Sequence, residues 1–313
     1  MALFRNIAGT LSEVNEKQIK LEKHIQELTE ENLQTVLGLE FISTEFEHEN
    51  LRLDTVAYDK ETNAFVIIEY KRDRSFSVVD QGYAYLSLLL NNKAEFILLY
   101  NEATGHTLSK SGVDWTQSRV IFIAQSFTIH QQQAINFRDM PIELWKVKMY
   151  DNDMVLYDQL KPRATSASIK TVNKDPAVVK VSNEVKVYDV ASHFTGAKIT
   201  STDIYEMLRD KLVQWQPKIQ ENPRKSYIGF SLKDNGTDTL IYVHVHSDGL
   251  RVEVPRIEPG DVADPLGKLT YKEGSRERFN TPISYLVIHG EDDADYTMSI
   301  VKQVYAKFFS KNN

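Results

Sequence analysis

The stretch RLDTVAYDKETNAFVIIEYKRD, Arg52 to Asp73, decides how the first half of the chain is interpreted. Its second part, AFVIIEYK, is an apolar run that predicts a buried strand, yet it ends in Glu69 and Lys71. Because side chains alternate along a strand, these two opposite charges share one face. The preceding run, LRLDTVAYD, predicts a neighbouring strand with Asp54 among apolar residues. The stretch therefore predicts a charged group at the end of a buried pair of strands.

The regions on either side of this stretch predict an α/β core built around a mixed central sheet flanked by helices. Helical periodicity runs from about 19 to 37, and a strand pattern follows at 39–49. After the opening stretch, 77–90 predicts a helix. The short apolar runs EFILLY (95–100) and RVIFIA (119–124) predict strands that are covered on both faces. A helix near 131–137 and a hairpin over 142–160 complete the predicted core.

The rest of the chain predicts a linker and a second, smaller α+β domain. Residues 161–186 lack sustained periodicity and are rich in lysine, so they are assigned to a basic linker between residues 1–160 and 187–313. The last part predicts a helix, three strands, a further strand and a final helix. The turns Asn235-Gly236 and Asp248-Gly249 are strong hairpin signals. On the second of the three strands, Tyr242, His244 and His246 share one face, which favours a half-exposed polar surface over a two-histidine metal site.

Composition limits the classes of function. The chain has 313 residues and no cysteine, which excludes disulfides, thiolate catalysis and cysteine-based metal sites and fits a cytoplasmic protein. No apolar run approaches the ~20 residues that span a bilayer, so no membrane association is expected. Residues 1–160 carry 15 Lys and Arg against 24 Asp and Glu, and the remainder carries 22 against 20. A polyanionic partner would therefore be held by local basic groups or metal ions, because the overall field does not attract it.

The carboxylates of the opening stretch suggest metal chemistry. If the two strands are antiparallel neighbours, Asp54 and Glu69 converge, and two carboxylates at close range repel unless a cation lies between them. A hard divalent ion such as Mg²⁺, or Mn²⁺ in its place, suits oxygen ligands. Lys71 would place a positive charge beside a reacting phosphate. These parts are what metal-assisted phosphodiester hydrolysis requires. Taken alone, however, a Glu-x-Lys pair at a strand end is most often a surface ion pair.

Polar residues on the flanking helices strengthen the hypothesis. Gln81 and Tyr85 are one turn apart on the apolar stripe of the helix after the strand. Glu22 is three residues from both Ile19 and Ile25, which places it on an apolar stripe of the first helix. A polar side chain on a buried face needs a partner, and a shared metal and phosphate site would provide one.

With these residues assembled, the pattern resembles the PD-(D/E)XK nuclease superfamily over about residues 15–125. The resemblance rests on R-x-D, on VIIEYKR and on D-Q-G-x-x-Y, and it is similar to the branch of prokaryotic endonucleases that act on branched or mismatched DNA. It implies a restriction-endonuclease-like core that uses Mg²⁺ or Mn²⁺. It also implies roles for six residues: Asp54 and Glu69 as metal ligands, Lys71 as the catalytic lysine, Glu22 as the helix-borne acid, and Gln81 and Tyr85 as the motif on the following helix.

The resemblance has one departure and one extension. Asn50-Leu51 stands where many relatives have a glycine before the aspartate strand, which bears on the backbone geometry there. From about residue 186 the chain resembles a family known only as a domain of unknown function, and that likeness implies no activity.

The leading hypothesis is a Mg²⁺-dependent DNA endonuclease acting in repair or in defence against foreign DNA. Arg52, Arg72 and Arg74 flank the site and are suited to phosphate contact, although charged residues at strand ends also serve solubility. The alternatives are a catalytically silent module of the same fold that binds nucleic acid or a protein, and a membrane-associated accessory protein, for which no amphipathic basic helix is evident. Whether the DNA is double-stranded, single-stranded or branched, and whether the chain is a homodimer, is left open.

Overall fold

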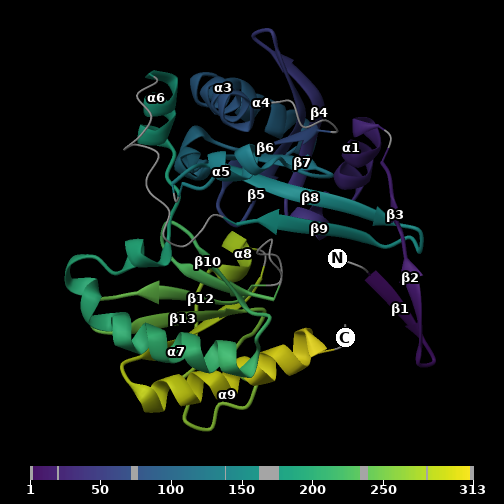
Figure 1. The fold of residues 1–313 in the computed structure, drawn as a ribbon. Coiled ribbons are helices and arrows are strands. Elements are labelled where there is room, and N and C mark those ends of the chain that lie inside the picture. The colour runs from purple at the N-terminus through teal and green to yellow at the C-terminus, as the bar shows by residue number, and fades with distance from the viewer. Residues whose placement is uncertain are drawn as a thin grey trace. The chain divides into compact units, whose positions relative to one another are not determined.

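The computed structural model describes residues 3–19, 21–71, 77–137, 139–161, 176–232, 239–279 and 281–310. The chain divides into two compact units, Met1–Val187 and Tyr188–Asn313, each with its own sheet (Figure 1).

Among the described residues, the strands of the first unit are β1 (Leu3–Ile7), β2 (Thr10–Val14), β3 (Glu16–Lys17), β4 (Glu40–His48), β5 (Leu51–Asp59), β6 (Ala64–Lys71), β7 (Arg119–Ala124), β8 (Ile142–Tyr150) and β9 (Val155–Leu160). Its helices are α1 (Glu22–Glu31), α2 (Leu33–Leu37), α3 (Val78–Asn91), α4 (Lys93–Thr104), α5 (Ile129–Ala134) and α6 (Pro176–Glu184), with short 3₁₀ turns η1 (Lys110–Gly112) and η2 (Trp115–Gln117).

The first unit is an α/β structure around a mixed sheet, as the sequence predicts. The strand order is β3-β8-β7-β6-β5-β4, and β9 also pairs with β8. Strands β4, β5 and β6 form an antiparallel meander, whereas β6, β7 and β8 run parallel. The parallel strands are joined by helical crossovers, which puts helices on the faces of the sheet.

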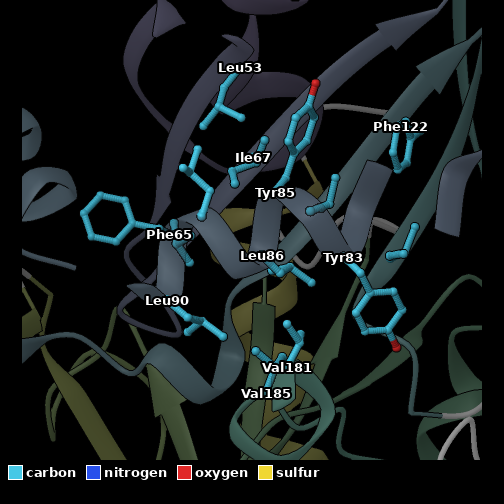
Figure 2. Close-up of a cluster of buried hydrophobic side chains, with 14 of the residues drawn as sticks. Leu53, Phe65, Ile67, Tyr83, Tyr85, Leu86, Leu90, Phe122, Val181 and Val185 are labelled. Atoms are coloured by element: carbon cyan, nitrogen blue, oxygen red, sulfur yellow. The ribbon is translucent and has the colours of Figure 1, made fainter. Parts of the chain in front are cut away.

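Strand β6 is the centre of this sheet and is buried on both faces, which explains its continuous apolar sequence. Phe65 and Ile67 belong to the core that contains residues of α3, α4 and α6. Val66 and Ile68 belong to the core beneath α1 and α2. The alternation that predicts Glu69 on the Phe65 face is therefore present in the fold. Figure 2 shows part of this α3-side core, in which Phe65 and Ile67 from β6 lie in one cluster with Leu86 from α3.

Two segments differ from the prediction. The predicted strand at 95–100 is wrong, because these residues lie in helix α4. Phe96 and Tyr100, one turn apart, are buried, whereas Leu98 is 52% exposed, and this is a helical period that the continuous apolar run conceals. The β1–β2 hairpin is not predicted from the sequence, and its turn is formed by Ala8 and Gly9, both with positive φ.

The predicted linker contains part of the first unit. Residues 162–175 lie outside the described residues, but 176–184 form α6, which contacts α3. Val178, Val181 and Val185 enter the core on the α3 side, and Figure 2 shows Val181 and Val185 in one cluster with Leu86 of α3. The first unit therefore extends to Val187, and not to residue 160 as the sequence division places it.

In the described part of the second unit, the strands are β10 (Gln220–Pro223), β11 (Ile228–Ser231), β12 (Thr239–Val245), β13 (Leu250–Pro255), β14 (Thr270–Tyr271) and β15 (Ile283–Ile288). The helices are α7 (Thr202–Trp215), α8 (Ser275–Phe279) and α9 (Glu291–Phe308), preceded by the 3₁₀ turns η4 (Val190–His193) and η5 (Gly196–Ser201).

The second sheet is antiparallel with the order β10-β11-β12-β13-β15-β14. Helices α7 and α9 contact each other and share one apolar core with the sheet (Figure 1). The Asp248-Gly249 turn connects β12 to β13 as predicted, and the Asn235-Gly236 turn lies outside the described residues. The unit is thus a sheet with two helices packed on one face.

Candidate active site

The site lies where strands β5 and β6 part. Their antiparallel pairing ends with Thr55 opposite Ile68, after which β5 continues along β4 and β6 continues along β7. Asp54 and Glu69 are the next residues on each strand. The Asp54 Oδ2 accepts a hydrogen bond of 2.9 Å from the backbone N–H of Tyr70. The Asp54 side chain therefore replaces a backbone hydrogen bond between β5 and β6, and the two strands separate at this point.

The Glu69 carboxylate is buried, with 3% of its surface exposed. Its Oε1 accepts hydrogen bonds from Lys71 Nζ at 2.6 Å and from Gln81 Nε2 at 2.8 Å. Its Oε2 is also buried and has no hydrogen-bond partner within the part of the chain that the structure describes. A buried carboxylate oxygen without a partner costs about 1–3 kcal/mol or more, so this atom has an unmet need for a donor or a cation.

Helix α3 supplies the third side of the group. Ser77 caps its N-terminus by accepting a hydrogen bond from Asp80 N–H. One turn in, Gln81 Nε2 also lies 2.7 Å from the Tyr85 hydroxyl, which in turn donates to the carbonyl of Arg52 at 3.3 Å. Burial and the nearby Glu69 carboxylate raise the pKa of Tyr85, so it remains a neutral hydroxyl at neutral pH. The side chains from β5, β6 and α3 are thus joined in one network.

The electrostatics of the pair favour a cation. Burial and the Glu69 carboxylate raise the pKa of Asp54 to about 6, against the lowering effects of the Tyr70 N–H, Lys71 and Arg52. Two carboxylates therefore repel each other in a partly buried place that has one lysine. A divalent ion between them would satisfy Glu69 Oε2 and remove this repulsion.

The donor set fits Mg²⁺ or Mn²⁺. Within the described residues, no group of three or more His, Cys, Asp or Glu side chains could hold a metal, so Asp54 and Glu69 would act as a pair. Mg²⁺ commonly binds through one or two carboxylates and keeps several of its waters. The two carboxylates and the unpartnered Oε2 suit such an ion.

The structure differs from the prediction at Glu22. Helix α1 begins at Glu22, so Ile19 lies outside the helix and the predicted stripe does not extend that far. Glu22 is exposed, whereas the buried face of α1 carries Ile25, Gln26 and Thr29. The interpretation of Glu22 as a buried acid on the apolar stripe is therefore wrong.

The predicted arginines are only partly described. The Arg52 side chain is 58% exposed, and its Nη1 lies 4.0 Å from Glu45 Oε2. Its charge acts on the site by lowering the pKa of Asp54. Arg72 and Arg74 lie outside the described residues.

The structure also contains a polar network behind Asp54 that is not predicted from the sequence. Gln26 Nε2 lies 3.1 Å from the Asp54 carbonyl and 3.0 Å from Thr44 Oγ1, and it also contacts Glu30. Thr55 donates to the same Glu30 carboxylate. This network fixes the β5 backbone at Asp54. The signal in the sequence is the polar pair Gln26 and Glu30, at i and i+4 on the face of α1 that carries Ile25.

In the second unit, His244 Nδ1 lies 3.1 Å from the Ser226 carbonyl, and His244 Nε2 lies 3.6 Å from Glu253 Oε2. Both neighbours are oxygen atoms of the protein, which agrees with the interpretation of this strand face as a polar surface. None of the described helices is long and apolar enough to cross a membrane.

Comparison with known proteins shows the family. Over 304 residues, the chain is 37% identical to an uncharacterized protein of Haemophilus influenzae strain Rd, and the match covers 97% of this chain and 99% of that protein. The chain belongs to the family of this Haemophilus protein. Residues 190–306 match the family model described as "Domain of unknown function (DUF5655)", which confirms the resemblance predicted for the second unit.

Two solved structures show weak similarity. A repair endonuclease from Pyrococcus abyssi is 19% identical with a TM-score of 0.23, and the match covers 39% of this chain and 45% of that one. A structure described as an EndoMS-dsDNA2 complex is also 19% identical with a TM-score of 0.23, and the match covers 38% of this chain and 43% of that one. The matched region is less than half of either of those chains.

Proposed function

We propose that the first unit is a metal-dependent nuclease of the PD-(D/E)XK type, with a restriction-endonuclease-like core, that hydrolyses phosphodiester bonds in DNA. The observation that carries the proposal is the buried, unpartnered Oε2 of Glu69, next to an Asp54 carboxyl whose pKa is raised to about 6. A structural ion pair does not need this second, repelling carboxylate. A metal-binding pair does.

Each residue has a role that its contacts support. Asp54 and Glu69 would hold the ion, which would polarise a phosphoryl oxygen and lower the pKa of bound water. The Tyr70 N–H holds one carboxylate in position, and Gln81 and Lys71 hold the other. Lys71, with its side chain 21% exposed, can turn toward substrate and stabilise the negative charge that develops on phosphate.

The chemistry of the site supports DNA as the substrate. The first 160 residues are acidic overall, so the ion and nearby guanidinium groups would have to attract the phosphate backbone. Arg52, and by the sequence hypothesis Arg72 and Arg74, would make these contacts. Repair of branched or mismatched DNA and defence against foreign DNA are the processes in which such an activity would serve.

One observation favours a second candidate, a catalytically silent module. The 2.6 Å contact between Lys71 Nζ and Glu69 Oε1 already neutralises one carboxylate without a metal. If this pairing persists when nucleic acid or a protein is bound, the fold binds and does not cut.

Cleavage assays separate the two candidates. Fluorescently labelled duplex, branched and single-stranded DNA are incubated with Mg²⁺, Mn²⁺ or EDTA. We expect cleavage with the metals and at least a hundredfold loss for Asp54→Asn, Glu69→Gln and Lys71→Ala. The matched control is Asp158→Asn, an exposed carboxylate on β9, which should cut like the wild type. If the wild type and Lys71→Ala are equally inactive on all substrates, the enzyme proposal fails.

Metal binding is measured separately by calorimetric titration with Mn²⁺ in the absence of DNA. The wild type should bind and Glu69→Gln should bind at least tenfold more weakly. Equal heats for the two proteins would refute the metal site even if some cleavage were found.

A further inference from the structure

The second sheet has two chemically different faces. One face carries aliphatic side chains, among them Val243, Val252 and Leu286, which pack with α7 and α9. Because residues directly opposite each other on paired strands share a face, the neighbouring positions form the other face. Helices α7 and α9 share the core of the first face and do not pack on the second, which we call the polar face. Helix α8 borders the polar face, because the Phe279 ring lies against Lys272.

Two rows of residues cross the polar face. In the first, Tyr242 on β12 is opposite Glu253 on β13, which is opposite Tyr285 on β15. In the second, His244 is opposite Arg251, which is opposite Val287. The tyrosines, His244 and Arg251 are half-buried, and Val287 is 46% exposed. The face is therefore partly accessible and combines aromatic rings with basic groups.

Basic groups outnumber acidic ones at the centre of the polar face. Glu253 is buried, and both of its oxygens lie 2.7 Å from Lys272 Nζ. Arg251 Nη2 also contacts this carboxylate, at 3.1 Å from Glu253 Oε1. Although burial would raise the pKa of Glu253, His244 and Lys272 lower it to about 2. One carboxylate thus faces two permanent cations and an imidazole.

Not every nitrogen of these basic side chains has a hydrogen-bond acceptor. Within the described residues, Arg251 Nε is buried and has no hydrogen-bond partner, and the neighbour of His244 Nε2 is Glu253 Oε2 at 3.6 Å. Arginine can only donate hydrogen bonds, so its unpartnered nitrogen needs an acceptor. Helix α9, on the opposite side of the sheet, begins with the acidic run Glu291, Asp292 and Asp293. An anionic ligand would therefore be attracted to the polar face and repelled from the start of that helix.

Aromatic rings lie beside the basic groups of the polar face. The Arg251 guanidinium carbon lies 3.9 Å from the centroid of the Tyr285 ring, which is a stacked cation–π contact. The Tyr227 and Tyr242 rings meet edge to face, with centroids 5.0 Å apart. Aromatic rings and guanidinium planes on a sheet are the surfaces on which unpaired bases stack, while adjacent cations hold the phosphates.

We propose that the polar face of the second unit binds single-stranded nucleic acid. Arg251, Lys272 and His244 contact the phosphates, and bases stack on Tyr242 and on the Tyr285–Arg251 pair. Bases in a duplex already stack on one another and present only their edges, so the rings discriminate against it. An acidic peptide would use the charge but would leave the rings without a role. This binding is independent of the nuclease proposal, because it requires neither metal nor the first unit's carboxylates.

The test is fluorescence anisotropy with the full chain, fluorescein-labelled dT20 and a duplex of the same length, in EDTA at low salt. We expect dT20 to bind at least tenfold more tightly than the duplex. Tyr242→Ala should weaken dT20 binding about tenfold, the effect of losing one base stack. Arg251→Gln should weaken it by a similar factor and reduce the dependence of binding on salt. Lys302→Gln on α9 is the matched control and should bind like the wild type.

Two further variants protect the test from misfolding and from binding elsewhere. Lys272→Gln alone would leave the buried Glu253 unpaired, so it is combined with Glu253→Gln, and thermal melting checks that each variant is folded. Asp158→Asn changes only an exposed carboxylate of the first unit and should leave dT20 binding unchanged, whereas a loss of binding confined to Lys71→Ala would place the binding at the proposed nuclease site. The proposal is overturned if Tyr242→Ala and Arg251→Gln bind like the wild type, if only Lys71→Ala weakens binding, or if poly-glutamate displaces dT20 at equal concentration. None of these results depends on whether the first unit cuts DNA.

Discussion

Replacing Asp54 by asparagine should stabilise the first unit while abolishing its proposed activity. At neutral pH the wild type must ionise a carboxyl whose pKa is raised from 3.8 to about 6 by burial and by Glu69. A difference of about 2 pKa units corresponds to ~3 kcal/mol, and solvent exposure and coupling to Glu69 reduce the expected gain to about 1–3 kcal/mol. Asparagine keeps the hydrogen bond, since its Oδ1 can still accept from the Tyr70 N–H.

The sign of the pH dependence follows from the raised pKa. The folded state holds the Asp54 proton more tightly than the unfolded chain, so folding is not penalised below about pH 4. The penalty grows as pH rises from 3.8 to about 6 and is constant above that range. The increase in the free energy of unfolding caused by Asp54→Asn should therefore be largest at pH 7.5 and about a third as large at pH 4.5.

The assay is urea unfolding followed by tryptophan fluorescence at the two pH values. Trp115 and Trp145 are buried in the first unit, whereas Trp215 lies in the second, so a Trp215→Phe background isolates the signal. Asp158→Asn, an exposed substitution, should change the free energy of unfolding by no more than ~0.5 kcal/mol. A variant Asp54→Asn that is no more stable than the wild type at pH 7.5, or equally stabilised at both pH values, would refute the electrostatic reasoning.

Three other expectations follow from the same unit. Saturating Mn²⁺ should raise the melting temperature of the wild type but not of Glu69→Gln, because only a ligand of the native state stabilises it, and equal shifts would contradict the site. Val181→Ala on α6 should lower the free energy of unfolding in urea by ~1–3 kcal/mol, because Val181 is buried. For the same reason, a chain ending at residue 160 should be less stable than one ending at 187. Equal stability of these two chains would show that α6 is dispensable. Gly82→Val should destabilise the unit by ~1–3 kcal/mol, because even a Cβ there would lie 2.5 Å from Ile142 Cδ1, and unchanged stability would mean that Ile142 moves aside.

The sequence predicts the site better than it predicts the surrounding elements. Glu69, Lys71, Gln81 and Tyr85 come together because strand alternation and the helical i, i+4 spacing are local rules, and the hydrogen bonds in the fold follow both. Asp54 required one further assumption, that β5 and β6 are antiparallel neighbours, which is correct.

The errors arise where tertiary contacts decide the outcome. In α6, the apolar residues Val178, Val181 and Val185 have helical spacing, but intervening polar residues and neighbouring lysines make the segment look like a solvated tether. Its burial depends on the surface of α3, which no local pattern reveals. The placement of Glu22 on a buried stripe is wrong for a different reason: the helix starts three residues later than the periodicity suggests, and a helix start is the least certain part of such a pattern.

The position of the site also has a physical cause. Strand β6 is the last strand of the antiparallel meander and the first of the parallel set, so its end is where the two halves of the sheet part. Glu69 can be buried there because the cores on both sides of β6 hold the strand in place, with its neighbours Ile67 and Ile68 fully buried. A rigid strand keeps its terminal carboxylate close to Asp54 in spite of their repulsion, and under the proposed function an entering cation would find both carboxylates already positioned. An equally charged pair on a mobile loop would separate to relieve the repulsion, so the raised pKa of Asp54 reflects burial and a second carboxylate that the strands hold in place.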